Sequence, residues 1–162
     1  MKSSKLLAVL LLAAGAAFAA VAGEKKPDSP SEVIRKRTEA TKNVDYAALA
    51  ALSCGSSKVK MQKAAEKLAA IEKAARSGDA NAVRILEHIQ KQLTQARAAL
   101  KDLKIVCTDE KIDGDWAKVY VTISGDPSGH DGTGILHLKK VDGEWKYITP
   151  MDYINEAGSS KK

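Results

Sequence analysis

The sequence predicts an α+β protein in which N-terminal helices, including a long helical hairpin, pack on a four-stranded antiparallel meander sheet. Apolar residues recur at alternating spacings of three and four through residues 61–103, which is the period of an amphipathic helix. Four later runs are rich in β-branched and aromatic residues and are separated by turn-forming segments. Because the helices precede the strands, the pattern favours α+β over a parallel α/β fold.

The N-terminus has the composition of a signal peptide. Two lysines precede a Leu- and Ala-rich stretch, and residues 6–23 carry no charge. Ala20-Val21-Ala22 and Ala17-Phe18-Ala19 both have the small-x-small pattern of a cleavage site, so cleavage after Ala22 or after Ala19 stays open. An uncleaved membrane anchor is the alternative, although the stretch is only marginally long enough to span. We therefore expect an exported protein, in a bacterial periplasm or secreted.

The remainder of the chain is one domain in length. Cleavage after Ala22 leaves about 140 residues, enough for a real hydrophobic core. We expect a signal peptide at 1–22, a linker at 23–28, one domain at 29–155 and a disordered tail at 156–162. No later segment is apolar enough to cross a bilayer, so the mature protein is expected to have no transmembrane segment.

Capping residues predict the first two helices. Ser29 is suited to the N-cap and Pro30 to the first helical position, and this helix is expected to reach about Lys42. Asn43-Val44-Asp45 then breaks it. Asp45 is suited to cap a short second helix that ends at Gly55.

Two longer helices are predicted to pair as an antiparallel hairpin around Ser77-Gly78-Asp79. Their apolar seam consists of Met61, Ala64, Leu68, Ile71, Ala75, Ala82, Leu86, Ile89, Leu93, Ala96, Leu100 and Leu103. The short link favours pairing within the chain, and a helix of another chain is the alternative occupant of the seam. Residues 58–102 carry ten lysines and arginines against five acidic residues, a surplus more typical of a solvated face than of a binding site.

Hairpin turns predict which strand residues share a face. Asp142-Gly143 is a two-residue turn that pairs Val141 with Glu144 and, counting outward, Lys140 with Trp145 and Leu138 with Tyr147. A three-residue loop at 113–115 sets Ile105 against Ile123 and Cys107 against Val121. A two-residue loop would instead place Lys104 opposite Ile123. A register slip of one residue in either hairpin would move the side chains of the shifted strand to the opposite face of the sheet.

The two predicted faces suggest two kinds of site. The helix-facing side supplies candidates for a pocket that holds a small apolar ligand, unless the interior is simply filled: Val119, Val121, Leu136, Leu138, Trp145 and Tyr147. The outer side supplies candidates for a homodimer interface: Trp116, Tyr120, His137 and Ile148. The alternative is that the segment 151–154 folds back over these outer rings.

Cys54 and Cys107 are the only cysteines of the chain. In an exported protein an even pair predicts a disulfide bond. The chain has no CxxC motif, and two cysteines with three scattered histidines lack the spacing of a zinc site. We therefore expect no metal.

Several segments together resemble the cystatin-like superfamily named after nuclear transport factor 2, above all its small exported bacterial members of unknown function. The matching segments are Ser29-Pro30-Ser31-Glu32-Val33, Asn43-Val44-Asp45-Tyr46, Gly114-Asp115-Trp116-Ala117-Lys118-Val119-Tyr120-Val121 and Leu138-Lys139-Lys140-Val141-Asp142-Gly143-Glu144-Trp145-Lys146. The resemblance implies a cone-like domain, and it agrees with pairing through the sheets. The superfamily includes isomerases, dehydratases, accessory domains and ligand binders, so the fold specifies no activity.

A binding or accessory role is the preferred interpretation. An isomerase or dehydratase would need a carboxylate or imidazole inside the cone as a base, and the predicted inner face has neither. His88, His130 and His137 lie on separate elements. We expect a non-enzymatic domain without cofactor that holds a small apolar ligand or an envelope or protein partner. The alternatives are an enzyme using the cone pocket and an envelope-surface protein using the basic hairpin. Nucleic acid is not expected as a partner, because the basic residues are not interleaved with aromatics.

Overall fold

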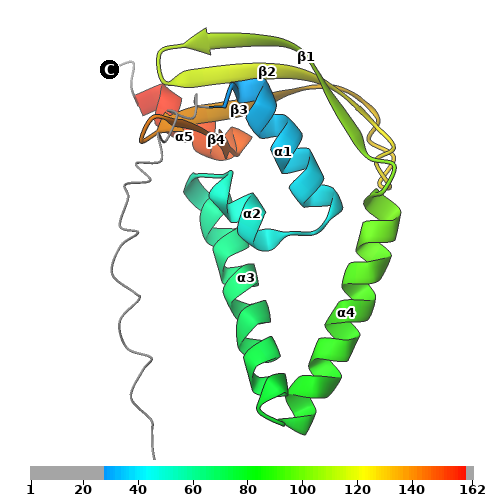
Figure 1. The fold of residues 1–162 in the computed structure, drawn as a ribbon. Coiled ribbons are helices and arrows are strands. Elements are labelled where there is room, and N and C mark those ends of the chain that lie inside the picture. Colours follow the sequence, from blue (N-terminus) through cyan, green and yellow to red (C-terminus); the bar gives the residue numbers. More distant parts are fainter. Residues whose placement is uncertain (1–27, 160–162) are drawn as a thin grey trace, which may run out of the picture.

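The computed structural model describes residues 28–159, so the predicted signal peptide and residues 23–27 of the linker lie outside the described residues. The described part contains five helices and an open four-stranded antiparallel sheet (Figure 1), which confirms the α+β prediction. The sheet order is β1-β2-β3-β4, as expected for a meander, and a cone-like shape is not observed. The elements are α1 Pro30–Lys42, α2 Tyr46–Ala51, α3 Gly55–Arg76, α4 Ala80–Leu100, β1 Lys104–Asp113, β2 Trp116–Ser124, β3 Gly132–Val141, β4 Glu144–Ile148 and α5 Pro150–Ser159.

The predicted helix caps are present. Ser29 accepts a hydrogen bond from the Glu32 amide at 3.2 Å, and Pro30 occupies the first turn. Asp45 accepts from the Ala48 amide at 2.9 Å and starts α2. However, α2 ends at Ala51 and not at Gly55, because the next residues leave the helix to pair with β4.

The register of the sheet agrees with the turn analysis. The predicted pairs Val141–Glu144, Lys140–Trp145, Leu138–Tyr147, Ile105–Ile123 and Cys107–Val121 are present. The β1–β2 loop was predicted wrongly: it contains two residues, Gly114 and Asp115, and not three. A β-bulge at Thr108 shifts the register by one residue and so restores the apolar pairs farther along the strands.

The bulge also turns a carboxylate inward, so the prediction of an inner face without a carboxylate is wrong. Between the bulge and the turn, Glu110 lies opposite Val119 and therefore on the helix-facing side of the sheet. Its carboxylate accepts from the Ser31 amide at 3.1 Å and from the Ser31 hydroxyl at 2.6 Å. An acidic group at this place satisfies an unpaired amide of the first turn of α1 and complements the helix dipole.

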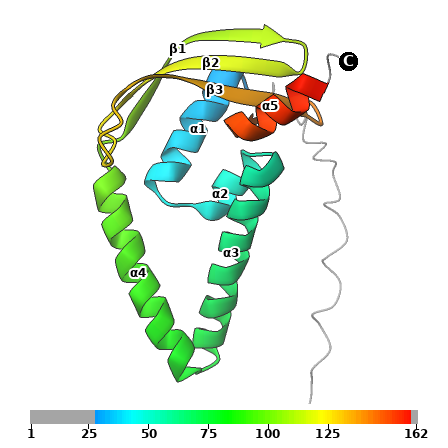
Figure 2. The same cartoon turned by 180° about the vertical axis from the view of Figure 1, so that it is seen from behind.

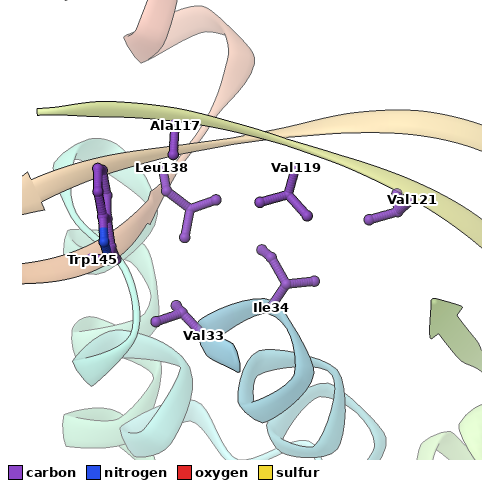
Figure 3. Close-up of a cluster of buried hydrophobic side chains, with 7 residues drawn as sticks. All are labelled: Val33, Ile34, Ala117, Val119, Val121, Leu138 and Trp145. Carbon is purple, nitrogen blue, oxygen red and sulfur yellow. The ribbon is translucent and has the colours of Figure 1, made fainter. Parts of the chain in front are cut away.

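Helix α1 fills the inner face of the sheet. Val33 and Ile34 lie against a layer of strand residues, and Figure 3 shows the seven buried side chains of this cluster: Val33, Ile34, Ala117, Val119, Val121, Leu138 and Trp145. Val119 and Leu138 have no exposed surface. The interior is therefore a packed core, as one of the two predicted alternatives had it.

Helix α5 covers one end of the outer face of the sheet. Thr149 accepts from the Asp152 amide at 3.2 Å and Pro150 follows it, so the helix begins on a regular capping pattern. The Tyr153 ring stacks on His137, with centroids 3.9 Å apart, and meets Trp116 edge-on at 5.3 Å. The helix continues to Ser159, so the domain boundary predicted after residue 155 lies inside it.

Replacing Glu110 with Ala should lower the free energy of unfolding by about 1–2 kcal/mol, because the start of α1 loses its carboxylate acceptor. Urea denaturation followed by circular dichroism measures this change. Glu87→Ala is the matched control, since Glu87 is exposed on α4 and makes no ion pair within residues 28–159. Equal midpoints for the two variants would contradict the capping role.

Candidate functional site

Helices α3 and α4 form an arm, residues 55–100, that projects away from the sheet (Figures 1 and 2). The helices are joined by the tight turn at Ser77-Gly78-Asp79, and Asp79 caps α4 as predicted. Both views show that they lie together at this turn and separate toward the sheet. The arm is therefore a V and not a hairpin closed along its whole length.

The arm joins the rest of the domain at two places, which we call its roots. The first root is the start of α3, which is bonded to the β4 edge of the sheet. The Cys54 amide donates to the Tyr147 carbonyl at 2.9 Å, and the Tyr147 amide donates to Leu52 at 2.8 Å. Asp152 of α5 accepts from the Ser56 amide and hydroxyl at 3.0 and 2.6 Å, which caps α3. Gly55 makes this approach possible, because its φ is +59° and a Cβ there would lie 2.8 Å from Asp152 Oδ2.

The second root is held at the opposite edge of the sheet. Helix α4 leads through buried Leu103 into β1. Because β1 and β4 are separated by three strand spacings of about 4.8 Å, the two roots are at least about 14 Å apart. Two packed helices have axes only about 8–10 Å apart. The width of the sheet therefore forces the two helices to diverge.

Divergence leaves an apolar cleft of about 320 Å³ between the predicted seam faces, which we call the arm cleft. Its walls and base are formed by Ala64, Lys67, Leu68, Ile71, Ile89, Gln92, Leu93 and Ala96 of the arm with Val44 and Tyr46 of the α1–α2 corner. Leu68, Ile71, Ile89 and Leu93 are only half-buried. The predicted seam is present, but its middle part has no partner within the described residues.

The base of the cleft is the corner between α1 and α2, which is hydrogen-bonded to the arm. Val44 has a φ of +50°, which turns the chain sharply between α1 and α2. Arg97 Nε of α4 donates to the Asn43 carbonyl at 2.8 Å and ties the corner to the arm. No sequence pattern marks Val44, Tyr46, Lys67 or Gln92 as site residues, because only the fold brings the α1–α2 corner between the helices.

The six predicted pocket residues belong to the hydrophobic core or pack against it. Val119, Val121, Leu138 and Trp145 are buried in the core, and Leu136 and Tyr147 pack against it. The guanidinium of Arg37 lies over the Tyr147 ring at 4.0 Å, and its Nε is buried without a hydrogen-bond partner. Burial lowers the pKa of Arg37. Arg37 therefore occupies the space beside this ring.

The predicted interface residues are mostly covered. Ile148 has no exposed surface, and the Tyr153 ring of α5 covers His137 and Trp116. Tyr120 remains half-buried beside exposed Ile135. Covering by the 151–154 segment, which was the alternative to a free outer face, is thus what is observed. Thr149-Pro150 together with Asp152 was the sequence signal that could have predicted this helix.

The predicted disulfide is absent, because both cysteines are free thiols. Cys54 lies beside β4 and Cys107 lies on β1, at opposite edges of the sheet, whereas a disulfide requires Cα atoms within about 7 Å. The Cys54 Sγ donates to the Tyr147 carbonyl at 3.5 Å, and the Cys107 Sγ donates to the Ser31 carbonyl at 3.8 Å. Burial raises the pKa of both thiols.

One loop brings together the residue types of a catalytic triad. The Ser128 hydroxyl lies 2.6 Å from Asp126 Oδ1 and 2.9 Å from His130 Nδ1, between β2 and β3. A nucleophilic serine gives its proton to the histidine, but this hydroxyl donates its single proton to the carboxylate. His130 Nδ1 must then act as donor to the serine. The arrangement stabilises an exposed turn and does not activate Ser128.

Within residues 28–159, no group of three or more His, Cys, Asp and Glu side chains has the geometry of a metal site. No helix in this same range has the length and apolar character needed to cross a membrane. Comparison of the chain with protein-family models, with curated proteins and with solved structures found no match. The resemblance to the nuclear transport factor 2 superfamily therefore stays a prediction.

Both thiols should be recovered free. Denaturation without reductant, followed by iodoacetamide, should add one carbamidomethyl group to Cys54 and one to Cys107, as read by mass spectrometry. In the native protein at pH 8 both should react more slowly, since their raised pKa leaves less of the reactive thiolate. A peptide pair joined through sulfur in unreduced material would contradict the unpaired arrangement.

The packing of α5 on the outer face of the sheet should weaken as the pH falls. Burial, and then the charge of Lys118, lower the pKa of His137, so the docked state disfavours its protonation. Below about pH 6.5, the His137 imidazole binds a proton more readily when α5 is undocked or the chain is unfolded than when α5 covers it. The free energy that favours the docked state is therefore lost as the pH falls toward the lower pKa that His137 has in the folded protein. Hydrogen exchange of residues 150–159 should accelerate between pH 7.5 and 5, after correction for intrinsic rates.

His137→Phe keeps a ring under Tyr153 but cannot titrate, so in this variant the extra exchange should disappear. His88→Gln is the control, because His88 is exposed on α4 and should leave the pH dependence unchanged. An unchanged profile in His137→Phe would refute the assignment.

Proposed function

We propose that the protein is an exported, non-enzymatic binding module that holds an amphipathic helix of a partner protein in the arm cleft. Export rests on the signal-peptide composition of residues 1–22. The observation that carries the binding role is the open seam: two apolar helix faces diverge, and leucine and isoleucine side chains between them remain half-exposed.

A helix suits this cleft because of the period of its walls. Leu68 and Ile71 on one side, and Ile89 and Leu93 on the other, recur at spacings of three and four residues. Such faces form the holes that receive apolar side chains of a third helix with the same repeat. Helix-in-groove recognition uses apolar anchors at these same spacings. The partner would supply the surface that the diverging helices do not supply to each other.

The other predicted roles have less support. A small apolar ligand on the inner face of the sheet would have to displace the Val33 and Ile34 side chains from the core. An enzyme would need an activated base, and the Ser128–His130 loop does not provide one. A homodimer through the outer sheet face would have to use the Tyr120 end, because α5 lies over Trp116 and His137.

A labelled model helix of about 15 residues tests the proposal, with Leu and Ala on one face and uncharged Gln and Ser on the other. Its fluorescence anisotropy should rise on titration with the purified protein. Leu68→Gln should weaken binding about tenfold, since it removes one buried apolar anchor. Val59→Gln is the matched control, because Val59 lies on α3 outside the cleft and is 50% exposed.

Circular dichroism should show that both variants keep their helix content. Absence of binding in the unmodified protein, or equal weakening by Leu68→Gln and Val59→Gln, would reject the arm cleft as the binding site.

A further inference from the structure

Most basic residues of the arm have no ion pair among the described residues. On the domain body, ion pairs with carboxylates are formed by Arg35, Lys36, Lys42, Lys139 and Lys146, whereas Arg37, Lys101, Lys104, Lys111, Lys118 and Lys140 form none within residues 28–159. On the arm, the only ion pair within the described residues joins Arg76 to Glu72. Five α3 lysines therefore have no ion pair in the described part of the chain: Lys58, Lys60, Lys63, Lys67 and Lys73.

One of these lysines lines the cleft, and a second lies on the same side of α3. Lys67 lines it directly, between Ala64 and Leu68. Lys60 precedes it by seven residues, which is two helical turns, so both lie along the same side of the seam about 10 Å apart. The uncharged Gln92 of α4 also lines the cleft, and none of the described lining residues is a carboxylate. The rim on this side is therefore positive and has no neutralising group of its own.

We propose that the occupant of the arm cleft is an acidic amphipathic helix of another protein, with carboxylates about seven residues apart that pair with Lys60 and Lys67. This inference rests on the proposed function and specifies its partner. Apolar side chains would enter between Leu68 and Leu93, and the carboxylates would lie along the α3 rim. Complementary charge at a rim increases the association rate and selects among partners that share the same apolar pattern.

The charge also argues against a second copy of this chain as occupant. The arm carries nine lysines and arginines against four acidic residues, so pairing two arms would bring two surfaces of the same sign together. An anionic lipid surface would attract the same lysines. It would attract Lys63 and Lys73 as well, although they do not line the cleft. The apolar cleft beside Lys60 and Lys67 favours the helix.

Three labelled model helices with one common Leu/Ala face test the inference, their polar faces carrying Glu at seven-residue intervals, Lys at the same positions, or Gln. At low salt the acidic helix should bind about tenfold more tightly than the basic one. The difference should shrink to about twofold or less in 0.5 M salt, because exposed ion pairs are screened.

Lys60→Gln with Lys67→Gln should remove the preference for the acidic helix over the basic one. Lys58→Gln with Lys73→Gln, which removes the same charge outside the cleft, should keep most of the preference. Equal binding of acidic and basic helices would overturn the acidic partner while the cleft proposal stands, whereas binding of none of the three would overturn the cleft itself.

Vesicles containing an anionic phospholipid supply the competing outcome. The helix would be replaced by a lipid surface if the protein binds these vesicles, if Lys58→Gln with Lys73→Gln weakens that binding as much as Lys60→Gln with Lys67→Gln, and if the protein shows no preference among the helices. Sedimentation of the protein as a dimer that Leu68→Gln dissociates would likewise replace it with a second copy.

Discussion

The width of the sheet controls the arrangement of this protein. Helix α3 starts beside β4, whereas α4 leads into β1, so a four-stranded sheet separates the two roots of one helical hairpin. Helices joined by a short turn pack closely where they can, and here they can do so only near the turn. The V shape follows from the width of the sheet, which separates the two roots, and from the shorter distance at which two helices pack. It requires no special feature of the helices themselves.

The rest of the fold fills the space that this separation creates. Helix α1 packs Val33 and Ile34 on the sheet, and the corner that follows it, tied by Arg97 to Asn43, lies between the roots of the arm. Helix α5 contributes on the other side, since Asp152 caps α3 while Tyr153 packs on the outer face of the sheet. The arm is thus attached to a body that is itself well packed, and its open part is confined to the cleft.

The residues that form the core are different from those that line the arm cleft. The core is formed by side chains that sequence analysis had grouped as a pocket, and they are needed to hold α1 on the sheet. The half-buried leucines and isoleucines of the arm do not belong to this core and remain partly exposed. Lysines without an ion pair among the described residues lie along the same arm, and Lys67 lines the cleft itself. An apolar cleft beside unneutralised charge is the surface on which the proposed function depends.

The sequence by itself determined the first four helices, the four strands, several helix caps and much of the sheet register. Ser29 and Asp45 cap helices locally, and Asp142-Gly143 sets the last hairpin, because these preferences depend only on neighbouring residues. The seam residues of the arm were also recognised from their period alone. Turn and pairing preferences were insufficient where two hairpin geometries fit the same sequence pattern. In the β1–β2 hairpin, a two-residue turn with a bulge is present in place of the predicted three-residue loop.

Only the tertiary structure decided what lies between distant segments. It placed Cys54 and Cys107 at opposite sheet edges, turned Glu110 inward to cap α1, and laid α5 over His137. It also opened the seam, since the divergence of α3 and α4 depends on strand order and sheet width, which no window of the sequence contains. A periodic apolar stripe specifies that a helix has a face to bury, but the distance between its anchors decides whether its neighbour in sequence can cover that face.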